Sequence, residues 1–147
     1  MNYAIVPMNS THIDALAGLE KQCFSSPWSA KSLAEELENP LAHFLAAELA
    51  GETAGYIGVQ EIIGECYITS IAVAPDHRRK GIAQALISAA ETGAKERGCD
   101  FITLEVRPSN KAAIALYEKN GYEAAGERKN FYTKPQEDAL IMTKFFI

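Results

Sequence analysis

Residues 66–106 read CYITSIAVAPDHRRKGIAQALISAAETGAKERGCDFITLEV, the pattern of a strand, a loop, a helix and a second strand. The part up to Val73 is rich in β-branched and aromatic residues, as strands are. Apolar residues recur at helical spacing from Ile82, and Gly98 marks the end of that helix. The last six residues read as a second strand. This stretch predicts a βαβ unit, and ligands of open α/β sheets bind beyond the carboxyl ends of the strands.

The loop inside this unit has the features of an anion-binding site. Arg78, Arg79 and Lys80 carry positive charge, and Gly81 permits close backbone approach because it lacks a Cβ atom. The first N–H groups of the following helix have no partner within the helix, and the helix dipole adds positive potential there. The loop therefore predicts a site for phosphate oxygens. A solvated basic loop before an ordinary helix is the simpler alternative for the loop taken alone.

The loop motif differs from two common phosphate-binding patterns. The sequence contains neither G-x-x-x-x-G-K-[ST] nor G-x-G-x-x-G. The residues that are present, Arg78-x-x-Gly81-x-Ala83, resemble the pyrophosphate-binding motif of the GNAT superfamily of N-acetyltransferases. That resemblance implies acetyl-CoA as co-substrate.

Length and composition limit the possible classes of protein. A chain of 147 residues with 48% hydrophobic content predicts a single domain, residues 1–147, with a substantial core. The net charge of −5 argues against direct nucleic-acid binding and suits a basic partner. The sequence has no apolar run of membrane-spanning length and no signal peptide, so we expect a cytoplasmic protein. Cys23, Cys66 and Cys99 form no C-x-x-C pair, and the histidines are scattered, so no disulfide framework and no metal site are expected.

The whole chain predicts the element order β-α-α-β-β-β-α-β-α-β-β. Strands are expected at residues 3–6, 44–49, 54–61, 66–73, 101–106, 122–128 and 139–145, and helices at 11–23, 30–38, 82 to the stop at 98, and 110–119. Ser10 or Thr11 is the expected cap of the first helix and Ser29 that of the second. The order predicts an α/β sandwich, in which helices flank a mixed, mostly antiparallel sheet.

Trp28 precedes the expected cap of the second helix, and Leu33 occupies the fourth helical position. These are the two positions of a hydrophobic staple, which accounts for the tryptophan in structural terms. A contribution of Trp28 to an acceptor site is the alternative.

Two residues are candidates for acid–base chemistry. Glu105 lies near the carboxyl end of its strand, beside the predicted phosphate loop, where a partly buried carboxylate can act as a general base. A half-exposed surface glutamate is the alternative. Tyr117 lies on the following helix, for which Asn110 is the simplest N-cap. With an ordinary pKa of ~10 a tyrosine stays protonated at neutral pH and can donate a proton to a leaving thiolate. A core aromatic residue is the simpler explanation of Tyr117 from periodicity alone.

Most of the chain resembles the RimI-type ribosomal-protein alanine N-acetyltransferases. The longest matching block is Leu104-Glu105-Val106-Arg107-x-Ser109-Asn110-x-Ala112-Ala113-Ile114-x-Leu116-Tyr117. The other blocks are Phe24-x-x-Pro27-Trp28-Ser29, Ile71-Ala72-Val73-x-Pro75-x-x-x-Arg79-x-Gly81-Ile82-Ala83, Gly121-Tyr122, and Arg128-Lys129-Asn130-Phe131-Tyr132 followed by Glu137-Asp138-Ala139. Phe131 replaces a tyrosine of the family pattern, which removes one hydroxyl near the expected acceptor site.

This resemblance implies an enzyme that uses acetyl-CoA to acetylate the N-terminal alanine of a small-subunit ribosomal protein, whose basic N-terminal segment is the expected partner. It implies Glu105 as general base and Tyr117 as general acid. The implied cofactor-binding residues are Ile71, Ala72, Val73, Arg79, Lys80, Gly81, Ile82, Ala83, Gln84 and Asn110, the first three through their backbone. Direct attack in a ternary complex is expected, because no Cys–His pair suggests an acyl-enzyme. Acetylation of other N-termini or of a small-molecule amine, and a non-catalytic CoA-binding module, stay open.

Overall fold

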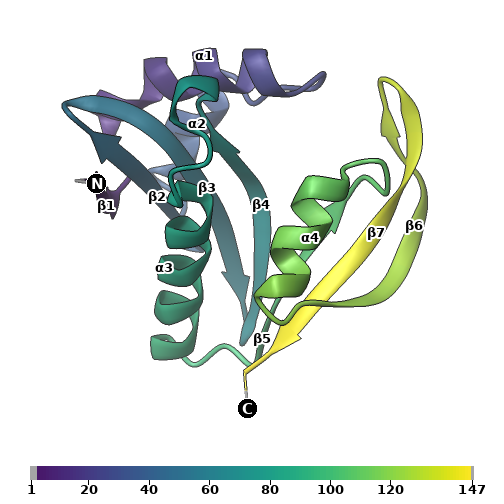
Figure 1. Cartoon of the computed structure of the whole chain (residues 1–147). Helices are drawn as coiled ribbons and strands as arrows, with labels where there is room; N and C mark the ends of the chain where they lie inside the picture. Colours follow the sequence, from purple (N-terminus) through teal and green to yellow (C-terminus); the bar gives the residue numbers. More distant parts are fainter. Residues whose placement is uncertain (1–2, 147) are drawn as a thin grey trace.

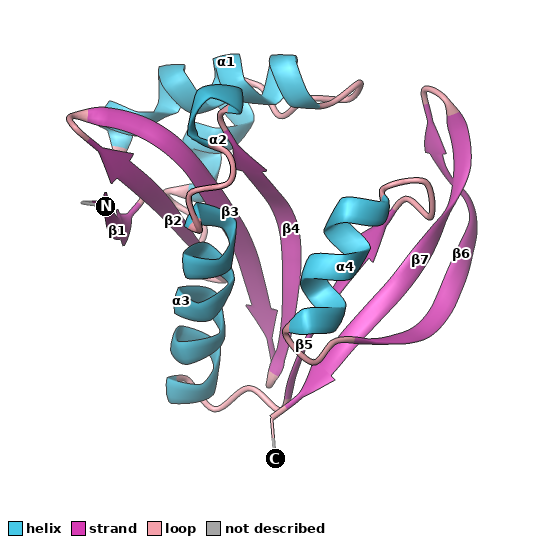
Figure 2. Cartoon of the chain, in the orientation of Figure 1, coloured by secondary structure: helices cyan, strands magenta, loops and turns pink. Residues whose placement is uncertain are grey.

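The computed structural model describes residues 3–146, which form one seven-stranded sheet with helices on its faces (Figures 1 and 2). The strands are β1 (Tyr3–Pro7), β2 (Ala42–Leu49), β3 (Glu52–Ile62), β4 (Glu65–Val73), β5 (Phe101–Val106), β6 (Glu123–Thr133) and β7 (Gln136–Phe145). The helices are η1 (Ser10–His12), α1 (Ile13–Cys23), α2 (Ala30–Glu36), η2 (Pro75–His77), α3 (Ile82–Glu96) and α4 (Lys111–Lys119). Residues 1, 2 and 147 of the predicted domain lie outside the described residues.

The strands follow the order β1-β2-β3-β4-β5-β7-β6, and β4 and β5 are the one parallel pair in the described sheet. The expected mixed, mostly antiparallel sheet is therefore confirmed. Because β4, α3 and β5 form the predicted βαβ unit, the carboxyl ends of two neighbouring strands point the same way. Figure 1 shows α4 beside these ends and the β6–β7 hairpin beyond it.

Several element boundaries differ from the predicted ones. Asn9, not Ser10 or Thr11, caps the first helical segment: its side chain accepts the backbone N–H of Thr11, and His12 accepts the N–H of Asn9 in return. The second helix ends at Glu36 rather than at residue 38. The last two strands extend further than predicted because they pair with each other up to the hairpin tip.

Two apolar clusters lie on the two faces of the sheet, because successive side chains of a strand point to opposite faces. One cluster contains Ile57 of β3 together with Leu86 of α3 and Tyr117 of α4. The other contains Tyr56 of β3 together with residues of α1 and α2 such as Leu16 and Leu33. The sheet is thus covered by α3 and α4 on one face and by α1 and α2 on the other.

A bulge interrupts β4 just beyond the point where its pairing with β5 ends. The register between β3 and β4 shifts so that Thr69 has no partner residue on β3. The parallel pairing of β4 with β5 covers only three residue pairs, ending at Tyr67 and Thr103, although both strands continue beyond this point. A bulge bends its strand and increases its twist. The two strands therefore diverge after the bulge and leave part of each edge unpaired.

Candidate active site

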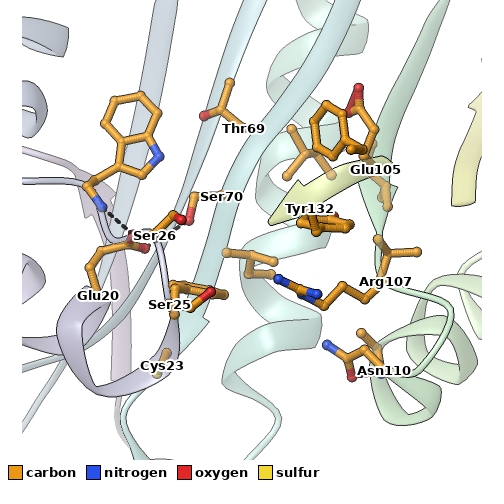
Figure 3. A pocket seen from close by; sticks show the side chains of 18 of the residues that line it. Glu20, Cys23, Ser25, Ser26, Thr69, Ser70, Glu105, Arg107, Asn110 and Tyr132 are labelled. Atoms are coloured by element: carbon orange, nitrogen blue, oxygen red, sulfur yellow. Dashed lines mark hydrogen bonds between the residues drawn. The ribbon is translucent and has the colours of Figure 1, made fainter. Parts of the chain in front are cut away.

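The space between the diverging strands is a cavity of about 650 Å³. Its walls come from the end of α1 and the loop that follows, from the bulged part of β4, from the end of β5, from α4 and from the tip of the β6–β7 hairpin. Figure 3 shows Glu20 and Ser70 on one side of this space and Glu105, Arg107 and Tyr132 on the other. Of the predicted site residues, Ile71, Glu105, Asn110 and Tyr117 line the cavity.

Glu105 lies on β5 with its side chain on the face opposite Leu104 and Val106, as the strand alternation predicts. Its side chain is 27% exposed, and one carboxylate oxygen is 3.0 Å from Nε of Arg128 on β6. The predicted base is therefore a partly buried carboxylate at the cavity wall, and a neighbouring cation holds it in place.

Tyr117 lies on α4, almost fully buried, with its ring 5.6 Å from that of Tyr122. It belongs to the cluster on the α3 face of the sheet, so it approaches the gap between β4 and β5 from the side opposite Glu105. Burial, with a smaller contribution from Tyr132, raises the pKa of Tyr117 to about 12. The hydroxyl consequently remains a proton donor throughout the neutral range.

The loop before α3 has a backbone suited to anions. Arg79 and Gly81 both adopt positive φ, 63° and 79°. Alternation between left-handed and right-handed residues turns successive N–H groups toward one side and forms an anion-binding concavity. No side chain caps the N-terminus of α3, and a Cβ at residue 81 would meet no described protein atom within 4 Å. The free N–H groups and the open space fit a phosphate group.

The remaining predicted cofactor-binding residues differ in burial and in the partners of their side chains. The side chain of Ile82 is buried in the core, so only its backbone is available to a ligand. The side-chain amide of Gln84 exchanges two hydrogen bonds, of 2.6 and 2.9 Å, with that of Asn120 after α4. This pair connects the start of α3 to the helix that carries Tyr117. Lys80 and Ala83 are partly buried, and Lys80 Nζ is 3.5 Å from Nδ1 of His77.

On β4, residues 71–73 pair with β3 along one edge, while their other edge lies beyond the pairing with β5. The side chain of Ala72 is buried between the sheet and helices α1 and α2, so only its backbone is available to a ligand. The carbonyl of Val73 already accepts a hydrogen bond from Nε of Arg78, and the same guanidinium donates to Sγ of Cys23. Arg78 is therefore turned back onto β4 and α1.

Asn110 accepts the N–H of Ala113 with its side chain and so caps α4, as predicted. The loop before it is tied to the β6–β7 hairpin. Glu137 accepts both the N–H and the hydroxyl of Ser109, and Arg107 donates to Glu137 and to the carbonyl of Pro135. The Arg107 guanidinium also lies over the Tyr132 ring, 4.3 Å from its centre. We call Arg107, Ser109 and Glu137 the hairpin latch.

Trp28 packs against the core and also borders the cavity. It contacts the α1–α2 cluster, with its ring 5.8 Å from that of Phe44 in an edge-to-face arrangement, and it also lines the cavity. Phe131, the departure from the family pattern, lines the cavity as well.

Glu20 of α1 also lines the cavity but was not among the predicted site residues. A signal was present in the sequence: Glu20 follows Leu16 by four positions, so a charged residue falls on the apolar side of an amphipathic helix. Arg107, Arg128 and Tyr132 lay within the blocks that resemble the family, but nothing in their spacing indicated a contact with the site.

Two further findings concern all of the residues that the structure describes. Within residues 3–146 no helix has both the length and the apolar character that a membrane crossing requires. The same residues bring together no group of three or more His, Cys, Asp or Glu side chains that could hold a metal ion.

Comparison with known proteins gives consistent matches. Residues 13–122 match the model of the acetyltransferase (GNAT) family. The chain is 41% identical over 140 residues to a putative ribosomal protein bS18-alanine N-acetyltransferase of Bacillus subtilis, covering 95% of this chain and 93% of that protein. The crystal structure of the ribosomal-protein-S18-alanine N-acetyltransferase from Escherichia coli matches with a TM-score of 0.88 at 33% identity, covering 97% of this chain and 92% of the other.

A more distant structure shares the fold and contains coenzyme A. The PaiA N-acetyltransferase from Thermoplasma acidophilum, solved in complex with coenzyme A, matches with a TM-score of 0.83 at 19% identity, covering 99% of this chain and all of the other.

Proposed function

The chain belongs to the acetyltransferase (GNAT) family, and from this premise we propose that it acetylates the α-amine of the N-terminal alanine of ribosomal protein bS18. The observation that carries the proposal is that Glu105 and Tyr117 reach one cavity from opposite faces of the sheet. The relatives with 41% and 33% identity bear names that specify this acceptor. The net charge of −5 favours a basic ribosomal segment as partner, and three free cysteines suit the cytoplasm.

Acetyl-CoA, the co-substrate of the family, supplies an activated acetyl group as a thioester. The uncapped start of α3 and the positive φ values of Arg79 and Gly81 support binding of its phosphates there. Residues 71–73 hold the pantetheine arm through backbone groups on the open edge of β4, and Asn110 lies at the same opening. No metal takes part in this proposal.

Glu105 accepts a proton from the attacking amine, directly or through one water molecule. An α-amine has an ordinary pKa of ~7.7–8.0, so roughly a tenth of it is already neutral at pH 7, against fewer than about one lysine in a thousand. A carboxylate is therefore an adequate base for a terminal amine. Tyr117 donates a proton to the sulfur of the leaving thiolate from the other face of the sheet. Direct attack of the amine on the thioester needs no acyl-enzyme.

The test is intact-mass analysis after incubation with acetyl-CoA and a peptide that carries the bS18 N-terminal sequence. We expect one added acetyl group, located on the α-amine by fragmentation, and none on the same peptide with its terminus already acetylated. Transfer of an acetyl group to a lysine side chain of the blocked peptide would contradict the proposal that the α-amine is the acceptor. Tight CoA binding without transfer to any amine in the assay would favour a binding module instead.

A further inference from the structure

Glu20 is a carboxylate at the wall of the cavity that has several hydrogen-bond donors but no cationic partner. Its side chain is 1% exposed. One oxygen accepts the backbone N–H of Trp28 at 2.8 Å, and the other accepts the hydroxyls of Tyr56 at 2.7 Å and Ser70 at 2.9 Å. Among residues 3–146, no lysine, arginine or histidine makes an ion pair with it.

Such an arrangement lowers the stability of the fold. A buried carboxylate loses its hydration, and hydrogen bonds from neutral donors offset this only in part. Two other charged side chains of the cavity wall do have an oppositely charged partner: Glu105 pairs with the exposed Arg128, and Arg107 pairs with Glu137. Burial, and to a smaller extent Glu20, raises the pKa of Tyr56, so the Tyr56 hydroxyl keeps the proton that it donates to this carboxylate.

Of the acceptor positions of the Glu20 carboxylate, one has no donor among the described residues. A carboxylate offers about four acceptor positions, two on each oxygen. The oxygen that faces Trp28 accepts one hydrogen bond and the other oxygen accepts two. Figure 3 shows this carboxylate beside Ser70, across the cavity from Glu105. Ser70 shares its side of β4 with Ala72, on the face covered by α1 and α2, which is also the face of Glu105.

We infer that Glu20 is a specificity-determining residue, which selects acceptors that carry a positive charge on the terminal nitrogen. The inference rests on the proposed function, because it concerns the amine that this reaction acetylates. An ammonium group that enters between Glu20 and Glu105 finds a carboxylate on each side. Glu105 then removes the proton, whereas Glu20, held by its three donors, stays in place as the electrostatic anchor.

The experiment compares two peptides in the presence of coenzyme A, which allows binding without transfer. One peptide begins with alanine, and the other begins with the 2-hydroxypropanoyl group, which replaces the ammonium by a neutral hydroxyl. Binding is measured by calorimetry at about pH 6.5, where the α-amine is mostly protonated. The wild-type protein is expected to favour the alanine peptide, and Glu20→Gln to reduce that preference by about tenfold.

Two variants separate charge from structure. Tyr56→Phe removes one hydrogen bond to Glu20 but keeps the carboxylate, so it should preserve the preference. Glu20→Gln removes the charge but can keep all three hydrogen bonds if the two hydroxyls reorient. If Glu20 had only a structural role, this substitution would weaken the binding of both peptides equally. An equal loss of affinity for both peptides, or no loss of affinity for either, overturns the inference.

The wild-type measurement decides the matter even if Glu20→Gln does not fold. If the wild-type protein binds both peptides equally well, it does not select for a charged terminal nitrogen, and the inference about Glu20 is overturned. Failure of the proposed function is a separate outcome: the alanine peptide then binds with the expected charge preference but gains no acetyl group when acetyl-CoA replaces coenzyme A.

Discussion

The carboxylate of Glu105 on β5 lies 3.0 Å from Nε of Arg128 on β6, two strands away in the sheet. Strand β7 runs between them, so the arginine side chain extends across this strand to reach the cavity wall. The Arg128 side chain is 56% exposed, which limits the energy of the pair because water screens it. The contact therefore orients the carboxylate and leaves it accessible to a substrate.

We expect Arg128→Ala to lower kcat/KM for the alanine peptide by no more than about fivefold, since only an exposed ion pair is lost. Lys129→Ala is the matched control, because this neighbouring lysine pairs with Glu127 and Asp138 away from the cavity. Steady-state kinetics on both variants provide the measurement. A loss at Arg128 as large as that of Glu105→Gln would mean that the guanidinium takes part in the chemistry.

Glu105→Gln should reduce kcat/KM by about a hundredfold or more at neutral pH, within the range of general-base catalysis. The deficit should narrow above ~pH 8, where the terminal amine is neutral without help. The measurement is kcat/KM from about pH 6 to about pH 9.5 for both proteins. An unchanged kcat/KM at every pH would exclude Glu105 as the base.

Tyr117→Phe should lower kcat by about a hundredfold and leave the affinity for coenzyme A unchanged, because only the proton donor is removed. Since the pKa of Tyr117 is raised to about 12, the hydroxyl keeps its proton as the pH rises through 10. The ratio of wild-type to variant kcat should therefore stay constant across that range. A ratio that falls toward one between about pH 8 and about pH 10 would contradict the assignment. Tyr122→Phe is the control, because its hydroxyl bonds to Glu91 in the core.

Arg79→Gly should weaken coenzyme A binding by about fivefold and leave the choice of acceptor peptide unchanged. Glycine suits this position because Arg79 has φ of 63°, so the substitution removes charge without backbone strain. Lys31→Ala on α2 removes an equivalent exposed charge elsewhere and serves as the control. Calorimetry with coenzyme A and competition between two peptides separate the effects. A change mainly in acceptor choice would argue against a phosphate site.

Arg107→Lys should raise KM for the acceptor peptide several-fold while leaving coenzyme A binding unchanged. Lysine keeps the charge but loses the planar group that covers Tyr132 and reaches the Pro135 carbonyl, so the hairpin latch loosens. Equal changes in KM for the peptide and in the affinity for coenzyme A would contradict a local effect on the hairpin.

The hairpin latch also predicts a response to acid. Desolvation opposes the shift, but hydrogen bonds from Ser109 and Arg107 lower the pKa of Glu137 overall. The contribution of this carboxylate to stability is present above its ordinary pKa and is lost as the pH falls through the lowered value. Glu137→Gln should remove this dependence, which thermal melts from about pH 3 to about pH 7 would detect. Identical pH dependence in both proteins would contradict the prediction.

The elements predicted well are those whose signals are local in the chain. Helix α3 and strand β5 follow from periodicity, and the cap of α2 follows from Ser29 directly before it. The ends of β6 and β7 were misplaced because their pairing with each other, not their composition, extends them to the hairpin tip. The cap at Asn9 was missed because it initiates a short 3-10 turn ahead of α1.

By itself the sequence predicted the βαβ unit, a candidate anion-binding loop and the two acid–base candidates, because these depend on residues close together along the chain. Only the tertiary structure decided what surrounds them. The bulge at Thr69 opens the cavity, Arg128 reaches Glu105 across a strand, and Glu20 meets Ser70 from 50 residues away. Strand register and helix docking set such contacts, and no local spacing encodes them.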